Sequence, residues 1–200
     1  MEAARALNGD KATRIVEAMR RSVAQRGAAG STFDHVAGEA GVSRGLLHYY
    51  FGSKEQLLVE VVRRDCDLRL AVLDERLAEA RTADDFIDLL VFSLEEVVRD
   101  DPDTITVVFE LFSLSRRNEE IASELSELLR RIREHVAELL AAKHEAGVLH
   151  LHADPDAVAD VLFSLADGVA LRMLADPGRD FSTTIAAGVT AVRALLDDPR

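Results

Sequence analysis

Residues 31–54 read STFDHVAGEAGVSRGLLHYYFGSK, a pattern of two short helices around a glycine turn. Ser31 and Thr32 offer an N-cap for the first helix, which ends at Gly41, and Ser43 caps the second. Gly41 supplies the dihedral angles that a tight turn between helices requires. This pattern predicts a helix-turn-helix, whose second helix lies in the major groove of DNA.

The same segment carries side chains suited to DNA. Arg44 is the expected base reader, because a guanidinium pairs bidentately with the O6 and N7 atoms of guanine. Gly45 would allow close backbone approach, Leu46 contact with a thymine methyl group, and Lys54 and Thr32 contacts with phosphates. The full set of expected DNA contacts is Thr32, Ser43, Arg44, Gly45, Leu46, His48, Tyr49, Tyr50 and Lys54.

A plain helical hairpin, with both tyrosines half-buried and the basic residues solvated, is the alternative interpretation. It is the better one for any single residue of the segment. The cap, the turn glycine, the second cap, the aromatic pair and the lysine nevertheless fall together within residues 31–54. That combination favours DNA binding.

Composition and periodicity describe the rest of the chain as helical. With 48% hydrophobic and 30% charged residues, 11 Gly and 4 Pro, the 200-residue chain is not of a disordered class. A single cysteine excludes an intrachain disulfide, and no apolar run approaches the roughly 20 residues of a membrane span. No secretory signal is visible, so a cytoplasmic protein is expected.

Apolar residues recur every three or four positions, which predicts an all-α protein of about nine helices. Ser53 and Gln56 predict a capping box at the start of a long helix.

Charge is divided unevenly along the chain. The net charge of -12 argues against a nucleic-acid partner. Residues 1–64, however, hold ten basic and seven acidic residues, whereas residues 65–200 hold 14 and 29. The segment with the helix-turn-helix is therefore positive, and phosphate affinity depends on local cations rather than on the total.

The sequence resembles the TetR family of bacterial transcriptional regulators over roughly residues 10–60. The matching positions are Thr32, Val36-Ala37, Gly41-Val42-Ser43, Tyr49-Tyr50-Phe51, Lys54-Glu55 and Leu57-Leu58. One departure is His48, where many members carry tyrosine. Residues 102–121 and 162–174 look like the C-terminal domains of the branch that includes the choline-responsive repressors, without naming a ligand.

The resemblance implies a three-helix DNA-binding domain, residues 1–54, and a ligand-binding and dimerisation domain, residues 55–200. It implies a homodimer on a palindromic operator, with repression relieved by a small molecule. A TetR-like activator and a helical interaction protein that does not bind DNA are the alternatives. The expected dimer interface is the last two helices, about residues 156–175 and 180–197, which are rich in alanine and glycine. An intrachain helix pair is the competing interpretation of these small residues.

A ligand pocket is expected among the aromatic residues of the middle helices. The expected lining is Phe86, Phe109, Glu110, Phe112 and Phe163. Phenylalanines at helical spacing are also typical of plain core. Glu110 lies in an apolar segment, so its carboxylate, if buried, would be protonated, serve a cationic ligand or pair with an arginine such as Arg130 or Arg133.

Enzymatic and metal chemistry find little support in the sequence. His144, His150 and His152 include a His-x-His pair, but no cysteine accompanies them and their segment is expected to be a loop. No nucleophile elbow, phosphate-binding loop or dinucleotide fingerprint is present. The expectation is therefore a protein that is not an enzyme, with no cofactor and no metal.

Overall fold

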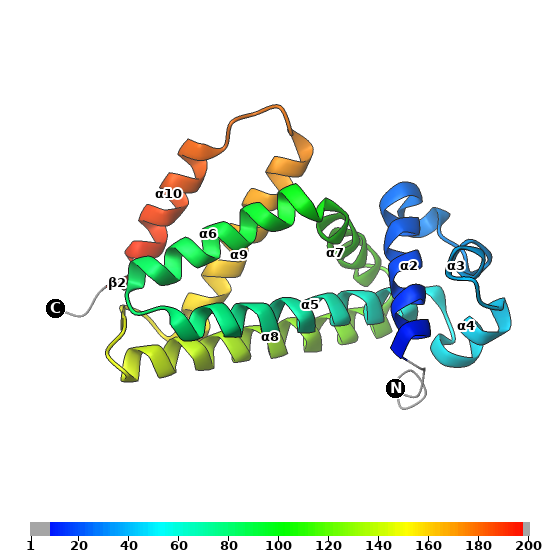
Figure 1. The fold of residues 1–200 in the computed structure, drawn as a ribbon, viewed down its shortest axis with the longest axis horizontal. Helices are drawn as coiled ribbons and strands as arrows, with labels where there is room; N and C mark the ends of the chain where they lie inside the picture. Colours follow the sequence, from blue (N-terminus) through cyan, green and yellow to red (C-terminus); the bar gives the residue numbers. More distant parts are fainter. Residues whose placement is uncertain (1–8, 198–200) are drawn as a thin grey trace. The chain divides into compact units, whose positions relative to one another are not determined.

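The computed structural model describes residues 9–197, with the side chains of residues 11–68, 70–72, 74–76 and 79–197. Nine helices and two short strands make up this part of the chain (Figure 1). The helices are α2 (Gly9–Gly30), α3 (Phe33–Ala40), α4 (Arg44–Phe51), α5 (Lys54–Glu79), α6 (Ala83–Asp100), α7 (Pro102–Ser115), α8 (Glu119–Glu145), α9 (Pro155–Ala175) and α10 (Ser182–Arg193). The all-α prediction is confirmed. Within residues 9–197, no helix is both long enough and apolar enough to cross a membrane.

Two compact units divide these helices. The first comprises the chain up to Leu68 together with Asp103–Leu128, and the second comprises Arg69–Pro102 and the chain from Leu129 onward. The first unit thus holds α2–α4, the start of α5, α7 apart from Pro102, and the start of α8. The predicted boundary after residue 54, between a DNA-binding and a ligand-binding domain, stays a prediction about function. The compact units are different, because α7 and the start of α8 group with the N-terminal helices.

Helices α2, α3 and α4, here called the reading head, form the N-terminal part of the first unit. Figure 1 shows α3 and α4 on one side of α2. Ile15, Met19 and Val23, four residues apart on α2, are at most 1% exposed. Val36 of α3 and Leu47 of α4 are fully buried as well. The apolar face of each helix therefore builds the small core that holds α4 in place.

The predicted helix starts and the turn of the reading head are confirmed. Thr32 Oγ1 accepts a hydrogen bond from His35 N at 3.3 Å, and Ser43 Oγ accepts one from Leu46 N at 3.2 Å. Gly41 adopts the left-handed conformation, with φ 65° and ψ 39°. The expected capping box at Ser53 is half formed: Ser53 Oγ accepts from Gln56 N at 3.1 Å, but the Gln56 side chain donates to Glu120 Oε1 at 2.7 Å. The Gln56 side chain, which the local pattern predicted to complete the capping box, therefore bonds to Glu120 of α8.

The second unit packs around an apolar cluster from α6, α8, α9 and the C-terminal segment. Its fully or nearly fully buried members include Phe86, Leu140, Val158 and Leu196. Helix α6 starts with a complete capping box, in which Thr82 and Asp85 each accept from the other's backbone N–H. Hydrogen bonds from Arg81 N and Thr82 to its carboxylate lower the pKa of Asp85.

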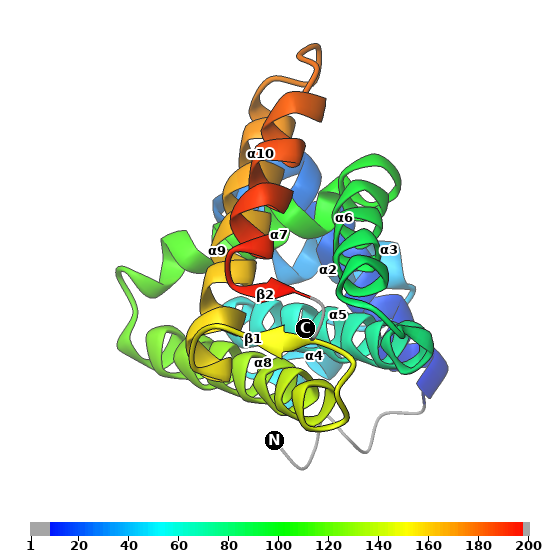
Figure 2. The same cartoon turned by 90° about the vertical axis from the view of Figure 1, so that its left-hand side faces the viewer.

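Two short strands correct the expectations for the C-terminal region. The helix expected over 180–197 ends at Arg193, and β2 (Leu196–Asp197) pairs antiparallel with β1 (His150–Leu151) (Figure 2). Residues 150–151 are thus a strand rather than a loop. Leu196 follows Val192 at helical spacing and is buried, as the periodicity requires, but it lies in the strand opposite Leu151. Burial alone does not distinguish the two conformations for a residue at the end of a helix.

Candidate nucleic-acid interface

The predicted DNA contacts all belong to the helix-turn-helix and the residues beside it. Six of them are exposed: Thr32, Ser43, Arg44, Gly45, His48 and Tyr49. Leu46, Tyr50 and Lys54 are half-buried. In the first unit, the predicted residues lie on α4, at the N-caps of α3 and α4, and at the start of α5.

Helix α4 presents one face to the core and another to solvent. Leu47 and Phe51, four residues apart, are buried. Arg44 and His48, also four residues apart, are exposed on the remaining surface. Tyr49 is 74% exposed, and its ring meets that of Tyr50 edge-on at 4.9 Å between centroids. The two tyrosines therefore differ in burial: Tyr49 is mostly exposed to solvent, and Tyr50 is half-buried.

Arg44 is held by Asp34, a residue that the sequence patterns did not mark as part of the site. Its Nη1 donates to Asp34 Oδ2 at 3.0 Å and to Oδ1 at 3.3 Å, and its Nε donates to His48 Nε2 at 3.3 Å. Asp34 and Arg44 are both more than half exposed, and an exposed ion pair is worth about 0.2–1 kcal/mol. The guanidinium is thus oriented across the turn by an exposed and weak contact. The negative charge of Asp34 on α3 is visible in the sequence. Its pairing with Arg44 is not, because no spacing rule relates residues on either side of a turn.

Lys54 lies where the sequence placed it, in the first turn of α5, but it has protein partners. Its Nζ donates to Ala28 O at 2.8 Å and to Ala29 O at 3.4 Å. An ammonium group has three donors, so two are directed at the end of α2. The side chain therefore joins α5 to α2 in addition to any role toward phosphate.

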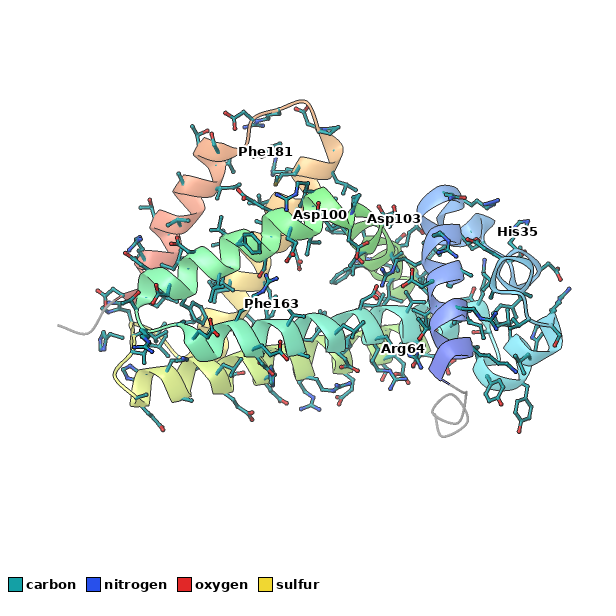
Figure 3. The ribbon with its side chains drawn as sticks, viewed as in Figure 1. His35, Arg64, Asp100, Asp103, Phe163 and Phe181 are labelled. Carbon is teal, nitrogen blue, oxygen red and sulfur yellow. The ribbon has the colours of Figure 1, made fainter. Side chains whose placement is uncertain are left out.

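The expected ligand-pocket phenylalanines fall in two places. Phe86 is 1% exposed in the core cluster of the second unit, and Phe163 of α9, labelled in Figure 3, packs against that cluster. Phe109 and Phe112 of α7 are half-buried in the first unit, with ring centroids 6.3 Å apart. Phe109 and Phe112 are therefore close neighbours, Phe86 and Phe163 belong to one apolar region, and the two pairs belong to different units.

Glu110 has a partner that neither expectation named. Arg130 pairs with Glu134 at 2.5 Å and Arg133 pairs with Asp156 at 3.1 Å. Glu110 Oε2 instead accepts a hydrogen bond from Ala28 N at 3.2 Å, across 82 residues of sequence. No periodicity or motif could have indicated a backbone partner at that separation.

The three C-terminal histidines lie close together beside the strands. Ring centroids are 5.3 Å apart for His144 and His150, and 4.8 Å apart for His150 and His152. His152 Nε2 is 3.2 Å from Asp197 Oδ1. In the part of the chain that the structure describes, no group of three or more His, Cys, Asp or Glu side chains is arranged to hold a metal ion.

An exposed helix after a capped glycine turn, on a small core of helices, defines an all-α protein of the helix-turn-helix class. Comparison with known families refines this class. Residues 15–61 match the family described as bacterial regulatory proteins, tetR family, and residues 87–198 match the BetI-type transcriptional repressor, C-terminal. The chain belongs to the TetR family of transcriptional regulators, with a BetI-type C-terminal domain. Its relatives are regulators and not enzymes, as the sequence predicted.

Individual relatives agree over most of the chain. The HTH-type transcriptional regulator BetI of Rhizobium meliloti (strain 1021) is 29% identical over 161 residues, which cover 79% of this chain and 75% of the relative. The transcriptional regulator FadR from Bacillus subtilis, solved in complex with stearoyl-CoA, has a TM-score of 0.75 at 19% identity and covers 90% of this chain and 96% of its own. A putative transcriptional regulator from Saccharomonospora viridis, solved with choline, has a TM-score of 0.68 at 23% identity, with coverages of 91% and 93%. The two solved structures establish likeness of fold.

Proposed function

We propose that the protein is a homodimeric repressor that reads a palindromic operator with α4 and releases it when a small molecule binds. The observation that carries the proposal is the two-faced packing of α4. Burial of Leu47 and Phe51 leaves Arg44 and His48 exposed on a helix that the core holds in place. Arg44, oriented by Asp34, is the proposed base reader, and the hydroxyl and imidazole groups around it are the proposed phosphate contacts.

A dimer is part of the proposal because one recognition helix contacts too few base pairs to select a genomic site. Helix α9 carries an exposed stripe of residues three or four positions apart, in which two large apolar side chains flank small residues. The stripe comprises Val161, Ser164, Gly168, Leu171 and Ala175. Val161 and Leu171 are 41% and 45% exposed. Ala187 and Ala191 of α10 add small exposed residues, which permit close approach of a second copy.

The smaller residues of α9 do not all serve this purpose. Ala159 and Ala170 are buried within the chain itself. The burial of these two alanines favours the alternative interpretation, an intrachain helix pair. Gly168 is exposed and can therefore belong to the proposed interface.

Relief by a small molecule is proposed by likeness to the family. The two solved structures were obtained with stearoyl-CoA and with choline, two chemically different ligands, so the fold they share does not by itself select an effector. We propose that the effector contacts α7 beside Phe109 and Phe112 and changes the orientation of the long helix α5. Release requires only that the effector prefer the non-binding arrangement, and a preference of about 1–3 kcal/mol gives about 5- to 150-fold relief.

Selection from a pool of random DNA duplexes tests the proposal. The enriched sequences should form an inverted repeat with half-site centres about 34–36 Å apart, or a multiple of one turn. Light scattering should give twice the 21.9 kDa mass of the chain. Failure to enrich any sequence, even at low salt, would overturn the proposal and favour the helical interaction protein. A reporter gene behind the selected operator then separates a repressor from an activator.

A further inference from the structure

Helix α2 is broken close to its C-terminal end. Gly27 has φ 67° and ψ 168°, and the chain then completes one more turn to Gly30. Such a break removes backbone groups from the helical hydrogen-bond ladder. Gly27 O accepts hydrogen bonds from Ser31 N at 3.2 Å and from Ser31 Oγ at 2.9 Å. The backbone N–H of Ala28 and the carbonyl oxygens of Ala28 and Ala29 bond to side chains from other helices.

Two charged side chains from other helices supply those partners. Glu110 of α7 accepts from Ala28 N at 3.2 Å, and Lys54 of α5 donates to the carbonyl oxygens of Ala28 and Ala29. The carboxylate meets a donor and the ammonium meets acceptors, so both are charge-assisted hydrogen bonds. A side chain at Gly27 would also face Glu110, whose Oε1 lies 3.4 Å from the position a Cβ would take. The turn 27–30 is therefore fixed from two sides.

This turn determines where the helix-turn-helix begins. Ser31, which follows it, is fully buried and accepts a hydrogen bond from Ser22 Oγ at 2.9 Å. The next residue, Thr32, is the N-cap of α3. A displacement of the turn is thus passed to α3, and through the short Gly41 turn to α4.

Helix α7 is in a position to cause such a displacement. It starts at Pro102, and Asp103, labelled in Figure 3, lies in its first turn. Glu110 lies about two helical turns further along α7. Because α7 is a continuous helix, a movement of α7 as a whole also moves Glu110, which contacts the turn at Ala28.

We propose that Glu110 is a positioning residue for DNA recognition, which with Lys54 sets the orientation of α3 and α4 and couples it to α7. This inference rests on the proposed function, namely operator reading by α4. In this inference, the Glu110 carboxylate holds the end of α2 and does not bind a cationic ligand. Lys54 holds the same turn through its carbonyl oxygens.

The test compares three variants with the wild type and a control. Glu110→Ala removes the acceptor, Glu110→Gln keeps a neutral acceptor, and Lys54→Met keeps the apolar stem without the donors. Glu124→Gln removes an equal charge from α8 in the same unit and is the control. Hydrogen exchange at the Ala28 amide should become about 10- to 100-fold faster in Glu110→Ala, less so in Glu110→Gln, and stay unchanged in the control.

The second readout is preference for operator spacing, which loss of a merely local contact would not alter. Each protein is titrated with the selected operator and with versions that have one base pair added or removed at the centre. The wild type should prefer the original spacing, and Glu110→Ala should lose about 2- to 30-fold of that preference, with partial recovery in Glu110→Gln. Lys54→Met should act in the same direction.

The outcomes separate this inference from the proposed function. If the wild type selects no operator, the proposed function fails and the inference with it. If the wild type selects an operator but the variants keep its spacing preference, only the inference is overturned. Unchanged exchange at Ala28 in Glu110→Ala would also overturn it. If Glu110→Ala does not fold, the ordering of wild type, Glu110→Gln and Lys54→Met decides the matter.

Discussion

The reading head contains two glycine turns that have similar φ values but different surroundings. Gly41, with φ 65° and ψ 39°, is followed within two residues by the Ser43 cap, and no described atom beyond its own neighbours lies within 4 Å of a Cβ placed there. Gly27, with φ 67° and ψ 168°, faces Glu110 of α7 and precedes a turn that Lys54 holds. The first turn is self-contained. The second depends on α5 and α7 of the first unit, and in our proposal it is where these helices act on the reading head.

Substitution by asparagine should separate the two turns most clearly. Asparagine adopts the left-handed conformation of Gly41 with little strain, so Gly41→Asn should cost under about 1 kcal/mol of unfolding free energy. The dihedral angles of Gly27 are accessible to glycine almost alone, and Gly27→Asn should cost about 1–3 kcal/mol. Urea denaturation of both variants measures the difference. Equal losses would contradict the distinction between the turns.

Loss of the Ser43 cap tests how self-contained the first turn is. Ser43→Ala should lower the unfolding free energy by about 0.5–2 kcal/mol, because the Leu46 N–H loses its acceptor. Ser113→Ala, an exposed position inside α7, should be close to neutral and is the matched control. A loss in Ser43→Ala no larger than that in Ser113→Ala would contradict a stabilising role for the cap.

The smallest effect is expected at an exposed cap outside the head. Asp85 has a lowered pKa in the folded protein, so its contribution to stability is present above the unfolded pKa of about 3.9 and is lost as pH falls through the folded value. The stability difference between wild type and Asp85→Asn should therefore be constant near neutral pH and shrink below about pH 4. Thermal unfolding across pH measures it, with Asp88→Asn on the same helix as control. A difference that grows on acidification would have the wrong sign.

The contrast between the turns also explains what the sequence could predict. The Thr32 and Ser43 caps bond to groups three residues away, so their pattern is visible in the chain itself. The contact of Glu110 with Ala28 spans 82 residues, and it is visible only once α7 and α2 are packed together. Asp34 beside Arg44 is intermediate, since the charges were visible but their pairing depends on the angle between α3 and α4.

The C-terminal region shows the same limit at the level of secondary structure. Leu196 satisfies the helical period that starts at Phe181, and periodicity therefore extended the last helix too far. The helix instead ends at Arg193 and Leu196 pairs with Leu151, a contact that joins segments that no local signal connects. Expectations for the phenylalanine pocket depended likewise on tertiary placement, which put Phe86 in a closed core.

The most direct test of base reading by α4 is the affinity of Arg44→Ala for the selected operator and for all its single-base-pair variants. If Arg44 reads a guanine edge, the variant should lose about 1–3 kcal/mol of binding free energy on the operator. It should also cease to discriminate at one position in each half-site while keeping its preferences elsewhere. A uniform loss across every sequence would show that Arg44 contacts only the phosphate backbone, and would contradict base reading by this residue.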